Sequence, residues 1–134
     1  MTARAALYAR YSSDLQRDAS IDDQLRICRQ LVDRHGWVEV GAYADRAISG
    51  STWERPELQR LLNDLRHRTI DIVVAESVDR LARDLEHLAR IHKAACYRRV
   101  KIVTVAEGEV SDLHIGLKGT MAAMTVREIA ARTL

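Results

Sequence analysis

One serine and several arginines in this 134-residue chain are spaced so that they could act together on a phosphate group. Arg10 and Ser12 lie two residues apart in a segment predicted to be extended, so their side chains point the same way with Cα atoms about 6–7 Å apart. Arg80 and Arg83 lie three residues apart and would share one face of a helix. A hydroxyl surrounded by guanidinium groups suits a substrate that carries several negative oxygens. Because arginines can stabilise the charge on these oxygens without a metal, the pattern predicts phosphoryl transfer.

The same residues also have simpler interpretations. A serine that follows a strand is often a turn or capping residue, which is an alternative role for Ser12. Arg80 and Arg83 stand next to Asp79 and Asp84, and the four charges could form ion pairs on a solvated helix. Spacing alone leaves these alternatives open.

Three other kinds of site are not supported by the motifs. His87 and His92 are five residues apart and do not face each other on a helix, so we expect structural or surface histidines and no metal site. The chain has no Gly-x-Ser-x-Gly elbow, which argues against an esterase. It also has no Gly-rich phosphate loop, so we expect no nucleotide or other cofactor.

The net charge is small, but the basic residues are unusually rich in arginine. The formal net charge is +2, which does not by itself indicate nucleic acid. However, 18 of the 21 basic residues are arginine, whose planar fork suits phosphate, although a GC-rich coding bias explains the ratio equally well. No apolar stretch is long enough to cross a membrane, and Met1–Arg10 does not resemble a secretory signal. Cys28 and Cys96 are predicted to be reduced core residues of a cytoplasmic protein.

Strands alternate with helices along the chain, which predicts one α/β domain over residues 1–134. The strands are predicted at Ala3–Tyr11, Trp37–Tyr43, Ile70–Ala75 and Val100–Val105. The helices are predicted at Ser20–Gly36, from Pro56 through Leu65, at Leu85–Tyr97, and from about His114 to Leu134. This order favours a three-layer fold with a mainly parallel sheet, helices on both faces, and a long C-terminal helix.

Polar residues gather just after the predicted strands, where parallel sheets usually form their sites. Those after the first strand are Arg10, Ser12, Ser13, Asp14 and Gln16. Those after the second and third strands are Asp45, Ser49, Gly50, Arg55, Asp79, Arg80 and Arg83. Three segments that are distant in sequence should therefore meet at one edge of the sheet.

At these positions the sequence resembles the catalytic domain of the serine recombinases, the resolvase and invertase family. Tyr8-Ala9-Arg10-Tyr11-Ser12 resembles the family's Tyr-Ala-Arg-Val-Ser segment, with Tyr11 in place of Val. Ser49-Gly50 followed by Arg55-Pro56 resembles its mobile loop, and Asp79-Arg80-Leu81-Ala82-Arg83 resembles its Asp-Arg-Leu-x-Arg motif. Small members often carry a Glu-Arg pair in the last helix, where this chain has Arg127-Glu128, so the resemblance favours a large phage-integrase-type member.

The resemblance implies site-specific cleavage and rejoining of double-stranded DNA. Ser12 would attack the scissile phosphodiester and form a 5′-phosphoserine, while Arg10, Arg80 and Arg83 bind the phosphate. Arg55 would join them in the active tetramer, and Asp79 would orient arginines. The resemblance also implies supporting roles for Gln16, Gln24, Tyr8, Asp45 and Ser49.

The same resemblance implies homodimers and tetramers formed through the C-terminal helix, with no membrane partner. The candidate partner-facing residues of this helix are Ile115, Ala122, Val126 and Ile129, each of which could equally pack against the sheet of its own chain. The family's DNA-binding region follows this helix, so we expect the chain to be a catalytic domain without that region. Two alternatives are a catalytically silent dimerisation or regulatory module of the same fold, and an unrelated phosphatase.

Overall fold

A five-stranded sheet forms the centre of the structure, which is a computed structural model that describes residues 2–11, 18–46 and 53–111. The sheet order is β2-β1-β3-β4-β5, and only the β4–β5 pair is antiparallel. The strands are β1 (Arg4–Arg10), β2 (Val38–Asp45), β3 (Ile72–Ala75), β4 (Lys101–Thr104) and β5 (Gly108–Glu109). The helices are α1 (Asp18–His35), α2 (Pro56–Asp64), the 3-10 turn η1 (Leu65–His67), α3 (Val78–Leu81) and α4 (Leu85–Tyr97).

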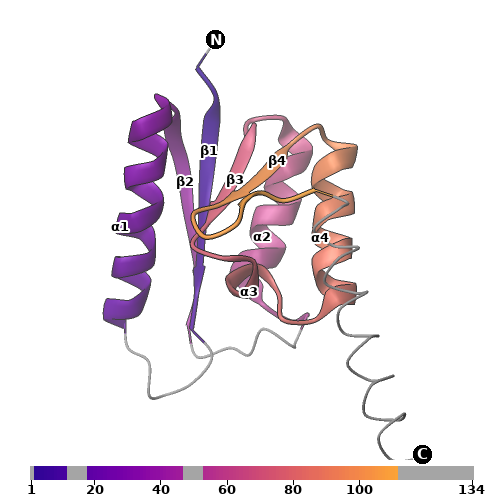
Figure 1. Cartoon of the computed structure of the whole chain (residues 1–134). Coiled ribbons are helices and arrows are strands. Elements are labelled where there is room, and N and C mark those ends of the chain that lie inside the picture. The colour runs from indigo at the N-terminus through magenta and orange to yellow at the C-terminus, as the bar shows by residue number, and fades with distance from the viewer. Residues whose placement is uncertain (1, 12–17, 47–52, 112–134) are drawn as a thin grey trace, which may run out of the picture.

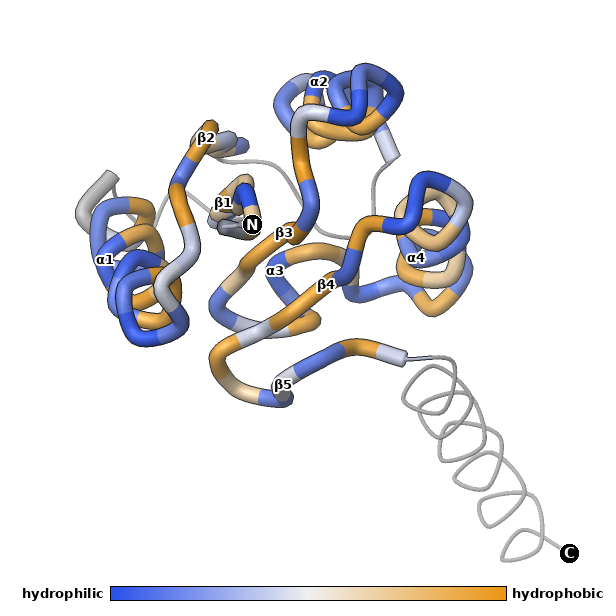
Figure 2. The backbone as a smooth tube through the Cα atoms, turned by 90° about the horizontal axis from the view of Figure 1, so that it is seen from above, coloured by the Kyte–Doolittle hydropathy of each residue, from blue (hydrophilic) through white to orange (hydrophobic). Residues whose placement is uncertain are grey.

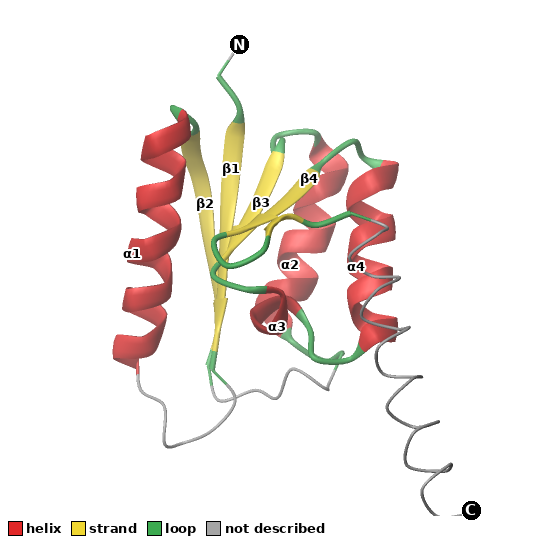
Figure 3. Ribbon diagram, in the orientation of Figure 1, coloured by secondary structure: helices red, strands yellow, loops and turns green. Residues whose placement is uncertain are grey.

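Helices cover both faces of the sheet and create two apolar cores. Figures 1 and 3 show α1 on one side of the strands and α2 and α4 on the other, and the view along the strands in Figure 2 agrees. β1 serves both cores, because successive side chains of a strand point to opposite faces. Leu7 packs on the α1 side, whereas Tyr8 packs on the α2 and α4 side. This burial on both faces is typical of a parallel sheet and confirms the predicted fold class.

The predicted elements within the described residues match the structure, with several corrections. The helix at Leu85–Tyr97 has the predicted bounds, and α1 begins at Asp18, slightly before the predicted Ser20. The one-turn helix α3 and the short strand β5 were not predicted, because neither is long enough to show a hydrophobic period. Cys28 is buried as predicted, but Cys96 is exposed on α4, so the prediction of a core position was wrong there. The predicted C-terminal helix lies outside the described residues.

Two helices end in the same hydrogen-bonded motif with different residues at its left-handed position. After α1, Gly36 has φ 70°, its N–H bonds the Asp33 carbonyl, and the Trp37 N–H bonds the Val32 carbonyl. After α4, Arg99 has φ 59° and makes the same pattern to Cys96, while Val100 bonds Ala95. This is the Schellman arrangement, in which glycine is the usual residue. A side chain at such a position costs about 1 kcal/mol, so Arg99 is held against a local preference.

Candidate phosphate-handling site

The carboxyl ends of β1 and β2 bring the first predicted residues together. Arg10 is the last residue of β1 and pairs in register with Asp45, the last residue of β2. β3 lies on the other side of β1 and leads into α3, which carries Asp79 and Arg80. Figure 1 shows α3 near the carboxyl ends of these strands. The sheet therefore collects segments from three distant parts of the chain, as the sequence predicts.

Arg10 is buried and is bonded to the backbone of α3. Its Nε donates to the Arg80 carbonyl at 3.1 Å and its Nη2 to the Asp79 carbonyl at 2.7 Å. In return, Nη1 of Arg80 donates to the Arg10 carbonyl at 3.1 Å. Burial, together with the nearby charges of Arg55, Arg83 and Arg80, lowers the pKa of Arg10 to about 10. The reciprocal bonds between Arg10 and Arg80 show that the segments after β1 and β3 meet.

Arg55, at the N-cap position of α2, is fully buried and ties together β1 and α3. Its Nη1 donates to the Tyr8 hydroxyl at 3.3 Å and to the Arg80 carbonyl at 3.4 Å. Its Nη2 donates to the Leu81 carbonyl. The buried Nε has no hydrogen-bond partner among the described residues. Arg55 therefore brings a buried positive charge to the carbonyl end of α3, where Arg10 also binds.

Tyr8 and Asp45 fix the start of α2, and with it Arg55. The Tyr8 hydroxyl donates to Oδ2 of Asp45 at 2.6 Å. The same carboxylate accepts the backbone N–H groups of Glu57 and Leu58, each at 3.0 Å. These N–H groups lie in the first turn of α2 and have no partner within the helix. Burial, opposed by the charge of Arg55 and reinforced by the bond to Asp45, raises the pKa of Tyr8, so the hydroxyl remains a donor.

Gln24 holds the backbone of Arg10 from α1. Its side-chain oxygen accepts the Arg10 N–H at 3.1 Å, and its amide nitrogen donates to the Arg10 carbonyl at 3.0 Å. The side chain is 1% exposed, so this pair of bonds is shielded from water. Gln24 therefore fixes the peptide that precedes Tyr11 and Ser12.

Arg83 and Asp79 lie at the outer side of this arrangement. Both residues are exposed. The chain leaves the helix at Ala82, whose φ of −164° and ψ of 139° are extended. Arg83 therefore does not share a helical face with Arg80, so the arrangement predicted from their spacing was wrong. Ser12, Gln16 and Ser49 lie outside the described residues, as do Ser13, Asp14 and Gly50.

Two residues that the sequence analysis missed hold the other end of α3. Glu107, in the turn between β4 and β5, accepts the Val78 N–H at 3.1 Å and the Thr104 hydroxyl at 2.6 Å. The Thr104 hydroxyl in turn accepts the Glu107 N–H at 2.9 Å. Thr104 and Glu107 have the Thr-x-x-Glu spacing of a capping box, which is the signal that could have revealed them. Here the pair caps a helix from another part of the chain instead of starting its own.

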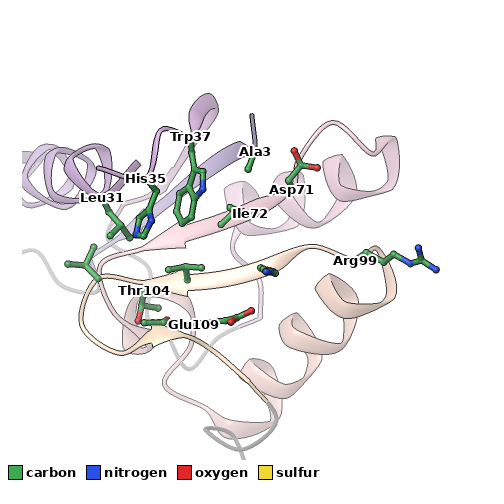
Figure 4. A pocket seen from close by; sticks show the side chains of 13 residues that line it. Ala3, Leu31, His35, Trp37, Asp71, Ile72, Arg99, Thr104 and Glu109 are labelled. Carbon is green, nitrogen blue, oxygen red and sulfur yellow. The ribbon is translucent and has the colours of Figure 1, made fainter. Parts of the chain in front are cut away.

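A cavity on the α1 face of the sheet contains none of the predicted site residues. It measures about 650 Å³ and is lined in part by Trp37, Ile72 and Glu109. His35 stacks on Trp37 with ring centroids 4.5 Å apart, and Figure 4 shows both rings at the wall of the cavity.

Among the described residues, no group of three histidine, cysteine or acidic side chains could hold a metal ion. No helix in the described ranges is long and apolar enough to span a bilayer.

The family model "Resolvase, N terminal domain" matches residues 5–134. The chain belongs to this family. A Bacillus subtilis protein named "Putative DNA recombinase" is 30% identical over 134 residues, covering 96% of this domain and 26% of that protein. The resolvase of transposon Tn501 from Pseudomonas aeruginosa is 41% identical over 68 residues, covering 51% of this domain and 35% of the resolvase. The domain thus spans about a quarter to a third of these relatives.

Solved structures support the same conclusion for the resolvase domain. The N-terminal catalytic domain of TP901-1 integrase superposes with a TM-score of 0.77 at 24% identity, covering 96% of this chain and 98% of that one. The C-terminal catalytic domain of ISC1926 TnpA, an IS607-like serine recombinase, gives a TM-score of 0.70 at 28% identity. That match covers 76% of this chain and 70% of the other. The predicted family and fold are therefore confirmed.

Proposed function

We propose that this resolvase domain cuts and rejoins double-stranded DNA at a specific site, with Ser12 as the nucleophile. The observation that carries the proposal is the convergence of Arg10, Arg55 and Arg80 at the carboxyl end of β1. Ser12 follows two residues after Arg10, so the chain leads from this cluster directly to a hydroxyl. Because guanidinium groups bind phosphate oxygens and stabilise their charge, this cluster of arginines favours a phosphodiester as the substrate.

The reaction exchanges one phosphate ester for another. Ser12 Oγ forms a bond to the scissile phosphorus, the bond from phosphorus to the 3′ oxygen breaks, and that oxygen receives a proton. The proton of the serine hydroxyl is lost as the new bond forms. Because the phosphoserine keeps the energy of the phosphodiester, the reverse reaction on a new 3′ hydroxyl reseals the strand without ATP. Arg10, Arg80 and Arg83 bind the phosphate, and Arg55, which already contacts the Arg80 carbonyl within the single chain, holds α3 beside them.

The other predicted residues support this reaction by positioning the arginines. Gln24 fixes the backbone of Arg10, while Tyr8 and Asp45 fix the turn of α2 that carries Arg55. Asp79 orients arginines, and Gln16 and Ser49 have supporting roles at the site. Subunits pair through the C-terminal helix as dimers and form tetramers during exchange. Light scattering with and without DNA tests this assembly.

A search for a covalent adduct tests the nucleophile. The protein is incubated with duplex DNA that carries the recombination site of its parent element, then denatured and analysed by gel electrophoresis and peptide mass spectrometry. We expect a nucleotide-modified peptide at Ser12 and no adduct with Ser12→Ala. Ser13→Ala is the matched control and should retain the adduct. An adduct that persists in Ser12→Ala would refute the assignment.

The role of Arg80 is tested by separating cleavage from binding. We expect Arg80→Ala to reduce cleavage by about 100-fold, the scale for loss of one charge-stabilising donor, while DNA affinity changes only a few-fold. Arg60→Ala, which removes an exposed arginine of α2, is the control. Equal losses of cleavage and affinity in Arg80→Ala would indicate a purely electrostatic binding role.

A further inference from the structure

A second concentration of arginine lies at the opposite end of the sheet from Arg10. A hollow of about 550 Å³ is lined by Arg4, Arg68, Arg98 and Arg99, together with Ile70, Asp71 and Tyr97. These residues come from the start of β1, the end of η1, the start of β3 and the end of α4. Figure 1 shows that this is the amino end of the parallel strands, whereas α3 lies toward the other end.

Arg4 neutralises the carboxylate that lines this hollow. Its Nε and Nη2 donate to the two oxygens of Asp71 at 3.0 and 3.1 Å, and its backbone N–H adds a third bond at 2.8 Å. Nη2 of Arg4 also donates to the Arg68 carbonyl at 2.9 Å. Asp71 is thus saturated by Arg4, and three further guanidinium groups around the hollow add uncompensated positive charge.

Two of these arginines occupy backbone conformations that favour glycine. Arg68 has φ 54° and Arg99 has φ 59°, and among the described residues they alone combine a side chain with a positive φ. The chain places glycine in the matching motif after α1, at Gly36, which lines none of these cavities. Non-glycine residues held in the left-handed region cluster at functional sites. Both line the same hollow, which gives a reason for arginine at both places.

The positive surface continues from the hollow along the groove between α2 and α4. This groove, about 640 Å³, shares Tyr97 and Arg98 with the hollow and is also lined by Arg66, Arg90 and Lys93. No acidic residue lines it. Tyr97 is 79% exposed at the junction, with the Arg98 guanidinium 5.0 Å from its ring centroid. We define the basic track as Arg66, Arg68, Lys93, Arg98 and Arg99.

We propose that the basic track binds the phosphate backbone of duplex DNA, as a contact separate from the cluster around Arg10. Guanidinium forks match phosphate oxygens, and phosphate contacts make up most of the sequence-independent affinity for DNA. The hollow itself offers a protein partner few apolar anchors, Ile70 and Tyr97. The groove adds the apolar residues Trp53, Leu62, Leu65 and Ala94. The choice of DNA over a protein partner therefore rests on the positive charge that the two surfaces share. The choice of DNA as the polyanion rests on the proposed function, whereas the positive surface does not.

Fluorescence anisotropy with a labelled duplex of random sequence tests the track. We compare the wild-type chain with Arg68→Gln/Arg99→Gln, which removes two charges at the track. The control Arg26→Gln/Arg60→Gln removes two exposed charges elsewhere. We expect the track variant to bind about 5–10-fold more weakly at low salt, and its slope of log affinity against log salt to shrink by about 1.8, as for two lost phosphate contacts. The control should retain nearly the full slope.

A third variant, Arg68→Gly/Arg99→Gly, guards against misfolding. Glycine suits both backbone positions, so this variant should melt no lower than the wild type while showing the same loss of DNA binding. Equal weakening in the track and control variants would overturn the proposal, since it would reflect net charge alone. Displacement of the duplex by a glutamate-rich peptide at equal charge concentration would overturn it too, because the track would then recognise carboxylates.

A failure of the basic-track proposal can be distinguished from a failure of the proposed cleavage at Ser12. All binding measurements are repeated in the Ser12→Ala background, which cannot form the phosphoserine. If track variants lose binding but no adduct ever forms at Ser12, only the proposed cleavage fails. If the adduct forms but track variants bind DNA normally, only the basic track fails.

Discussion

The two ends of the sheet use arginine in opposite ways. At the carboxyl end, Arg10 and Arg55 are 1% and 0% exposed, and the Nε and Nη2 of Arg10 and both Nη atoms of Arg55 are bonded to the carbonyls of α3 or to Tyr8. At the amino end, Arg68 and Arg99 are exposed on left-handed turns around a hollow. The first pair organises the protein backbone, and the second pair faces outward. Arginines at the two ends of the sheet therefore have different roles.

The difference shows what burial does to a guanidinium group. A buried arginine must find acceptors within the protein, because an unpaired buried charge is costly. α3 is a single turn and could not persist alone, since helix initiation is unfavourable. Arg10 and Arg55 at its carbonyl end, with Glu107 at its amino end, match the charge that each end of a helix prefers. The carboxyl-end arginines are thus part of the fold as well as candidates for phosphate binding.

The largest effect is expected from Arg55→Leu. The change leaves the Arg80 and Leu81 carbonyls and the Tyr8 hydroxyl without their buried donor. We expect the free energy of unfolding to fall by about 3 kcal/mol, measured by urea denaturation, and cleavage to be lost. Arg60→Leu, five residues later on the exposed side of α2, is the control and should change stability by under about 1 kcal/mol. Similar losses in both variants would remove the contrast between buried and exposed arginines.

Truncation of Glu107 tests how strongly α3 depends on its amino-end cap. We expect Glu107→Ala to reduce stability by about 1 kcal/mol, and cleavage by about 10-fold, because α3 carries Arg80. DNA affinity should change little, since Glu107 contacts no residue of the basic track. Glu107→Gln keeps an acceptor oxygen and should restore most of the cleavage.

Glu109→Ala is the matched control for this experiment. Its side chain lines the cavity on the α1 face, so α3 should be unaffected. If Glu107→Ala lowers stability without a larger effect on cleavage than Glu109→Ala, Glu107 is a structural cap and does not position the arginines.

The sequence predicted the layers of the fold and the residues of the site better than their contacts. Helical and strand periods are strong in long elements such as α1 and α4, and both were found. Position just after the predicted strands singled out Arg10, Asp45, Arg55 and Arg80, which the sheet brings together. Their use as buried hydrogen-bond donors could not be predicted, because it depends on the carbonyls of a one-turn helix without a periodic signal. The hollow likewise depends on two positive φ angles at arginine, where sequence rules expect glycine.

A smaller effect, of opposite sign, is expected at the amino end. Arg99→Gly relieves a left-handed conformation worth about 1 kcal/mol, while the added freedom of the unfolded chain returns about half of that. We expect a net gain of about 0.5 kcal/mol, which corresponds to a rise in melting temperature of about 2–3 °C by calorimetry. Arg98→Gly is the control: its φ is −95°, so glycine brings no relief there and stability should fall. A loss of stability in Arg99→Gly would show that the Arg99 side chain contributes to folding and is not held for binding.

The smallest effect concerns the Arg4–Asp71 pair, which lines the hollow. Hydrogen bonds from the Arg4 side chain and backbone lower the pKa of Asp71 below its ordinary value of 3.8. A depressed carboxyl pKa stabilises the fold above about pH 4, and this contribution is lost as the pH falls through the folded-state pKa. Both side chains are more than 40% exposed, so solvent screens the interaction and the change is small. We therefore expect Asp71→Asn to be slightly less stable than the wild type at pH 7 and to converge with it below about pH 3.

The same substitution should act in the opposite direction on DNA. Removal of the Asp71 charge leaves Arg4 uncompensated beside the basic track, so Asp71→Asn should strengthen duplex binding at pH 7 about two-fold, on the scale of a surface charge. In the Arg4→Gln background the loss of stability should shrink, because the side-chain pair is already broken, whereas removal of the Asp71 charge should still strengthen duplex binding. If Asp71→Asn left DNA affinity unchanged while the stability curve shifted as expected, the amino end would contain a structural ion pair with no part in binding. The contrast between the two ends would then concern burial alone.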